Sequence, residues 1–137
     1  MPELQGVVVT HGRLGEALVE AAEEITGVTG ALAALSNRGV GPLDLKSKLE
    51  EAVGDGPAVV FVDLASGSCG FAANTAVRNR DSLTVVTGVS LPILIDFLFH
   101  RDLPLAELAD RLVEKGRANI TAVPPTRCDD GAQAVSD

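Results

Sequence analysis

Short apolar runs alternate along most of the chain with segments in which apolar residues recur every three or four positions. The runs are typical of strands buried on both faces, and the periodic segments are typical of amphipathic helices. The predicted strands cover residues 6–10, 31–35, 58–62, 83–86 and 120–123. The predicted helices cover residues 14–25, 42–53, 72–78, 91–100 and 105–115. Strands separated by helices require crossover connections, which predict a mainly parallel sheet.

This order of elements predicts an α/β fold, with a single doubly wound sheet that carries helices on both faces. The chain has 137 residues, which leaves room for one such domain. Pro124 and Pro125 close the part that carries a clear pattern, so residues 1–123 are predicted to form the domain. Residues 124–137 are mostly polar and are predicted to be a frayed tail.

Composition excludes several classes of partner. Lys and Arg number 11 against 19 Asp and Glu, and the resulting net charge of −8 is unsuited to binding nucleic acid. Aromatic residues make up 3%, with no Trp and no Tyr, so platforms for stacking bases or sugar rings are not expected. The start of the chain has no signal-peptide pattern, and no apolar run is long enough to span a bilayer. We therefore expect a cytoplasmic protein without direct membrane contact.

Reactive and polar residues follow three of the predicted strands. Thr10, His11 and Gly12 follow the first strand, residues 63–70 follow the third, and residues 87–90 follow the fourth. Ligands of open parallel sheets bind beyond the carboxyl ends of the strands. We therefore expect an imidazole, a carboxylate and loops of hydroxyl and glycine residues to converge on one edge of the sheet.

His11 and Asp63 form the candidate catalytic pair. A neutral imidazole is a competent nucleophile near physiological pH, and His11 stands just before a helix, where unpaired N–H groups favour an anion. A carboxylate on one ring nitrogen would leave the other nitrogen free to attack. The alternatives are a histidine that only bonds backbone and an aspartate that only caps its loop.

The segment Ser66-Gly67-Ser68 offers small residues and hydroxyl groups that suit a phosphate group. Such loops are also common turns, and this one is neither a Walker loop nor a dinucleotide-binding fingerprint. Cys69 and Cys128 do not form a metal-ligand pattern, so we expect reduced thiols, no metal and no cofactor.

Four blocks together resemble the enzyme IIA domain of the mannose family of the phosphoenolpyruvate-dependent sugar phosphotransferase system. Residues 7–12 read Val-Val-Val-Thr-His-Gly and precede a helix that begins Leu-Gly-Glu-Ala-Leu. Val-Asp at 62–63 with Ser-Gly-Ser at 66–68, and the Gly-x-x-Leu-Pro-x-Leu segment at 88–94, are similar to further family blocks. The closing helix and strand over 105–120 agree as well, so the resemblance runs from about residue 5 to 123.

The resemblance implies that His11 accepts a phosphoryl group from the phosphohistidine of HPr and passes it to a IIB component. Asp63 would hold the ring nitrogen that is not phosphorylated. The phosphoryl oxygens would be bound by small residues at the strand ends, namely Thr10, Gly12, Ser66, Gly67 and Ser68. It further implies a homodimer that exchanges a short C-terminal antiparallel strand, and membrane contact only through a permease complex.

Three positions depart from the family pattern: Ser66 replaces a Gly, Cys69 replaces a Pro and Ser90 replaces an Asn. Two alternatives therefore stay open, a phosphorylation-state sensor that regulates another protein and the related phosphotransfer subunit of dihydroxyacetone kinase. A receiver-like domain is excluded, because it needs an acidic pair after the first strand, where this chain has Thr10, His11 and Gly12.

Overall fold

The structure is a computed structural model that describes residues 3–78 and 80–126. Its strands are β1 (Gln5–Thr10), β2 (Leu32–Ser36), β3 (Ala58–Val62) and β4 (Leu83–Thr87). Its helices are α1 (Leu14–Thr26), α2 (Pro42–Val53), α3 (Gly67–Val77), α4 (Leu91–Phe99) and α5 (Leu105–Ala118). The alternation of strand and helix predicted from the sequence is confirmed through α5.

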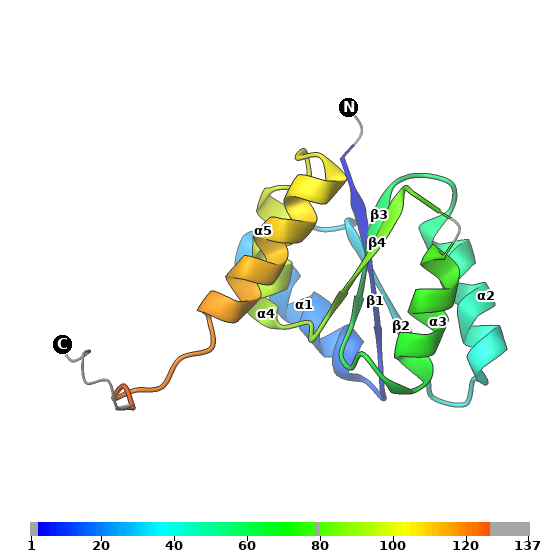
Figure 1. Cartoon of the computed structure of the whole chain (residues 1–137), viewed down its shortest axis with the longest axis horizontal. Coiled ribbons are helices and arrows are strands. Elements are labelled where there is room, and N and C mark those ends of the chain that lie inside the picture. Colours follow the sequence, from blue (N-terminus) through cyan, green and yellow to red (C-terminus); the bar gives the residue numbers. More distant parts are fainter. Residues whose placement is uncertain (1–2, 79, 127–137) are drawn as a thin grey trace.

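The strands form one parallel sheet in the order β2-β1-β3-β4. Val9 in β1 is aligned with Leu35 on one side and with Val62 on the other, so β1 and β3 end side by side. The chain leaves β1 toward β2 and later returns to the other side of β1, which makes the boundary of β1 and β3 the switch point of the sheet. The loops that leave these two strands turn at the same edge (Figure 1).

Two hydrophobic clusters lie on the two faces of the sheet. One combines Val8 and Phe61 with side chains of α1, α4 and α5, and the other combines Val7 and Val60 with side chains of α2 and α3. Figure 1 shows α2 and α3 on one side of the strands and α1, α4 and α5 on the other. All five residues of β3 are buried, because helices cover both of its faces. The doubly wound arrangement holds the strand ends in register.

Asp96 interrupts an apolar helix, and the structure gives its carboxylate a partner. Arg111 in α5 donates from Nε to Oδ2 at 2.9 Å and from a terminal nitrogen to Oδ1 at 3.0 Å. A buried carboxylate is tolerated only when it is paired in this way. The pair fastens α4 to α5 without any role at the strand ends.

Two predicted elements differ from the structure. α3 begins at Gly67, five residues before the predicted start, because the Ser-Gly-Ser segment enters the helix with Ser66 in the extended N-cap conformation. Residues 120–126 carry no strand in the single chain, so all four described strands are parallel. A short strand needs an edge to pair with, and the exchanged antiparallel strand stays a prediction. The predicted tail over 124–137 lies mostly outside the described residues.

None of the described helices has the length and apolar character that crossing a bilayer requires.

Candidate functional site

The imidazole of His11 and the carboxylate of Asp63 meet at the carboxyl ends of β1 and β3. Nδ1 of His11 lies 3.0 Å from Oδ2 and 3.3 Å from Oδ1 of Asp63. The backbone N–H of His11 also donates to Oδ2, at 3.0 Å. The two residues are 52 positions apart in sequence, and parallel pairing of Val9 with Val62 brings them together. The predicted contact between them is therefore confirmed.

The hydrogen bonds to Asp63 keep its carboxylate ionised and decide which ring nitrogen of His11 donates to it. Burial acts to raise the pKa of Asp63, but hydrogen bonds from the backbone and imidazole of His11 outweigh it and hold the pKa below its usual value. The carboxylate is then ionised and can only accept. Nδ1 of His11 consequently carries a proton, and in the neutral ring the lone pair is then on Nε2.

The free nitrogen Nε2 faces the first turn of α3. A Cβ built on Gly67 would lie 3.5 Å from Nε2, so the ring stands against the backbone of this glycine. Ser66 makes no side-chain capping bond, and the first N–H groups of a helix have no partner within it. An anion attached to Nε2 would meet these N–H groups and the positive end of the helix dipole.

The end of β2 is a third part of the site that the sequence analysis missed. Asn37 accepts the N–H of Gly12 at 3.2 Å, and its own amide nitrogen lies 3.4 Å from Oγ of Ser68. Asn37 thus bridges the loop after β1 and the start of α3. The polar residues Asn37 and Arg38 directly after the strand are the available signal, but the sequence does not show that β2 lies beside β1.

The other predicted phosphoryl-binding residues have distinct surroundings. Oγ1 of the buried Thr10 accepts the N–H of Gly15 at 2.6 Å, and the N–H of Gly12 is taken by Asn37. Thr10 and Gly12 therefore shape the loop that carries His11, whereas Ser66, Gly67 and Ser68 lie at the start of α3. Among the hydrogen bonds of the described residues, none joins the 87–90 loop to His11 or Asp63, although Val89 N–H donates to Val62 at 3.0 Å.

A family model described as the PTS system fructose IIA component matches residues 5–115 of this chain. The chain belongs to this family of IIA components of the phosphotransferase system. The family covers fructose- and mannose-type components, so the resemblance inferred from the sequence blocks is confirmed. Membership makes the protein a phosphotransferase-system component of the phosphocarrier type.

Solved structures of IIA components share the fold. The phosphotransferase system component EIIA from Streptococcus agalactiae superposes with a TM-score of 0.82 at 18% identity, covering 88% of this chain and 98% of its own. The mannose/sorbose specific IIA subunit from Enterococcus faecalis reaches 0.80 at 23% identity, with coverage of 93% and 99%. A sigma-54 interaction domain protein from Enterococcus faecalis reaches 0.68 at 16% identity, with coverage of 85% and 92%. No curated protein sequence matches the chain.

Cys69 brings a thiol into this IIA site, where the sequence indicated no ligand cluster. Single ligand atoms of His11, Asp63 and Cys69 lie within 4.8 Å of one another, and such a donor set suits zinc. Burial and the charge of Asp63 raise the pKa of the Cys69 thiol, which disfavours the thiolate that a metal requires. His11 and Asp63 are already bonded to each other. The geometry therefore favours the hydrogen-bonded pair over a metal centre.

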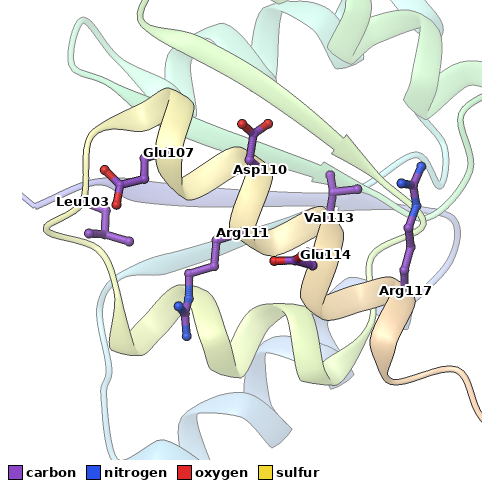
Figure 2. Close-up of a pocket in the computed structure, with 7 residues that line it drawn as sticks. All are labelled: Leu103, Glu107, Asp110, Arg111, Val113, Glu114 and Arg117. Atoms are coloured by element: carbon purple, nitrogen blue, oxygen red, sulfur yellow. The ribbon is translucent and has the colours of Figure 1, made fainter.

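The His11 ring stands at the surface, with 39% of its side chain exposed. A hollow of about 760 Å³ lies elsewhere, along α5 (Figure 2). It is lined by α5 and the loop before it, through Leu103, Glu107, Asp110, Arg111, Val113, Glu114 and Arg117. His11 and Asp63 are not among its lining residues. An exposed imidazole suits transfer to and from another protein.

Gly67→Ala is expected to impair phosphorylation of the IIA site through its added methyl group. Gly67 has a φ of +85°, so alanine strains the backbone by about 1–2 kcal/mol. Its methyl group would also occupy the space before Nε2, and we expect phosphoryl uptake to fall about tenfold to a hundredfold. Gly30→Ala is the control, since Gly30 has a φ of +82° and nothing within 4 Å of an added Cβ. Equal uptake by both variants, measured at equal folded fraction, would contradict the contact.

Proposed function

We propose that this IIA domain carries a phosphoryl group on Nε2 of His11, taking it from phosphorylated HPr and passing it to a IIB component. One observation carries the proposal. An ionised carboxylate holds Nδ1 at 3.0 Å and leaves Nε2 against Gly67, at the uncapped start of α3. We place such a carrier in the cytoplasm.

The phosphoryl transfer breaks one bond to phosphorus and forms one, so the step that we propose requires no cofactor. The bond between phosphorus and the histidine nitrogen of the donor breaks as a bond forms between phosphorus and Nε2 of His11. The donor imidazole leaves neutral, and His11 becomes a phosphorylated imidazolium whose Nδ1 proton stays bonded to Asp63. The carboxylate stabilises that positive ring, and the N–H groups of Gly67, Ser68 and Cys69 are placed to bind the phosphoryl oxygens.

Phosphorylation with labelled phosphoenolpyruvate, enzyme I and HPr tests the proposal. We expect label that is lost in acid and kept in base, as phosphohistidine requires, on the peptide that contains His11. An unlabelled protein, or label on any other residue, would reject the assignment. Addition of a purified IIB component should then discharge the label within the assay.

A regulatory role is the second candidate. The fold of a protein described as a sigma-54 interaction domain protein supports it, since that fold is similar to the fold of this chain. In that case His11 would still be phosphorylated by HPr, but a IIB component would not discharge it. The discharge step therefore separates the transport role from the regulatory one. It also separates transport from a role as a dihydroxyacetone kinase subunit, which would not require a IIB component.

We further propose that two copies pair along β4. In the described sheet β4 is bonded only to β3, which leaves its outer edge without a partner. Ile120 and Val123, which follow α5, are 83% and 93% exposed. Residues 120–123 can supply the antiparallel strand that the edge of a second copy lacks, and exchange would bury both apolar side chains.

Removal of residues 120–137 is expected to convert a dimer into a monomer. The reason is that the exchanged strand would be lost while α5, which closes the core through Leu108 and Leu112, is kept. Sedimentation equilibrium measures the mass of both forms. As a control, a chain that ends at residue 126 keeps the strand and should stay dimeric. A full-length monomer at high concentration would refute the pairing.

A further inference from the structure

The turn after β2 places a guanidinium beside the loop that carries His11. A terminal nitrogen of Arg38 lies 3.3 Å from the position that a Cβ on Gly12 would occupy. The backbone N–H of Arg38 donates to Oγ of Ser36 at 3.0 Å, which tightens this turn. Gly12 follows His11 directly, so Arg38 lies against the same loop as the nucleophile.

Asn37 connects this turn to the site. Its backbone N–H donates to the carbonyl of Thr10 at 3.1 Å, and its side-chain oxygen accepts the N–H of Gly12 at 3.2 Å. These bonds tie the residues on either side of His11 to the turn. The backbone of Arg38 is therefore held relative to the imidazole by the main chain and the side chain of Asn37.

Arg38 is also available to bind an anion. Among the ion pairs of residues 3–78 and 80–126, none involves Arg38, and its side chain is exposed. Asp63 places a negative charge on the Nδ1 side of the ring that would carry the phosphoryl group, and the whole chain carries −8. A dianion on Nε2 therefore needs a nearby cation that is not already paired.

We propose that the guanidinium of Arg38 binds the phosphoryl group carried on His11, with Asn37 as the positioning residue. The proposal rests on the proposed function, since it names a further binding residue of that site. Arginine suits this role because its planar fork donates two parallel hydrogen bonds to phosphoryl oxygens. It also offsets the charge of Asp63 as the phosphoryl group moves between nitrogens. In this proposal the segments that follow β1, β2 and β3 all contribute residues to the site.

The test compares Arg38→Gln with wild type using two phosphoryl donors. Phosphoramidate is a small donor that needs no docking surface, and phosphorylated HPr is the protein donor. We expect uptake by Arg38→Gln to fall about tenfold to a hundredfold with both donors, as loss of a charge-assisted bond predicts. The phosphorylated fraction at equilibrium should fall as well, and Arg38→Lys should restore part of both.

Arg13→Gln is the matched control. Arg13 is the arginine nearest to His11 in the sequence. Its side chain is 80% exposed, and its Nε lies 3.8 Å from Oε1 of Glu16. The variant removes the same charge from the same region, so an equal loss in both variants would overturn the contact in favour of a general charge effect. A loss confined to phosphorylated HPr would also overturn it and assign Arg38 to docking. A wild type that neither donor labels would refute the proposed function itself, whereas equal labelling of wild type and Arg38→Gln refutes only this inference.

Discussion

His11→Ala is expected to take up no phosphoryl group from phosphorylated HPr. The substitution removes the ring nitrogen that lies against Gly67 at the start of α3, and with it the proposed nucleophile. The remaining backbone N–H groups of Gly67 and Ser68 can donate to phosphate oxygens but have no lone pair that could form a bond to phosphorus. Label incorporated by wild type and variant, measured after precipitation in base, gives the comparison.

His100→Ala is the control for this variant, because the chain has two histidines. Nδ1 of His100 lies 2.8 Å from the carbonyl oxygen of Asp96, at the end of α4, and the residue has no contact with the site. We expect full labelling of His100→Ala. Label that survives in His11→Ala and disappears in His100→Ala would move the phosphorylation site and refute the role of the β1–β3 edge.

Asp63→Asn is expected to slow phosphoryl uptake by about one to two orders of magnitude while leaving the domain folded. An asparagine keeps the shape but no longer offsets the positive ring that forms when Nε2 is phosphorylated. Its amide can also present a donor to Nδ1, which would favour the wrong tautomer. Single-turnover uptake at saturating donor measures the effect. Asp55→Asn removes the same charge from an exposed position before β3, and its uptake should match wild type.

We also expect Asp63→Asn to change how the free energy of unfolding depends on pH. The pKa of Asp63 is lowered in the folded protein, so its hydrogen bonds stabilise the fold fully above the unfolded value of about 3.9. That contribution is lost as the pH falls through the folded pKa. Wild type should therefore have a larger free energy of unfolding in urea than Asp63→Asn above about pH 4. The difference should shrink at lower pH, and a difference that grows there would contradict the assignment.

The pairing of His11 with Asp63 could be predicted from the sequence because of local pattern and topology. Each residue follows a continuous apolar run, and continuous runs indicate strands of a parallel sheet. The ends of such strands meet at one edge, so a reactive residue after one strand and a carboxylate after another become candidates for contact. Residues 42–53 and 58–62 were located with correct bounds for similar reasons, since Pro42 begins the helix and Gly54 and Pro57 separate the two elements.

The part played by Asn37 and Arg38 could not be predicted in the same way. β2 is Ala-rich and weakly patterned, and its residues do not indicate which strand it lies beside in the sheet. Its position beside β1 follows from packing of the whole sheet, and only that position brings the turn after β2 to His11. The start of α3 could not be predicted because glycine and serine are poor helix formers, and here burial of Cys69 and Gly70 outweighs their propensity.

The sequence by itself determined which residues alternate between strand and helix, that the sheet is parallel, and that an imidazole and a carboxylate lie at its edge. These features depend on periodicity and on residue chemistry, both of which are local. Only the tertiary structure decided that Nε2 of His11 faces Gly67, that Cys69 is buried beside the pair, and that Arg38 lies against Gly12. Those contacts join residues far apart in the chain, and their geometry is set by how two layers of helices pack on one sheet.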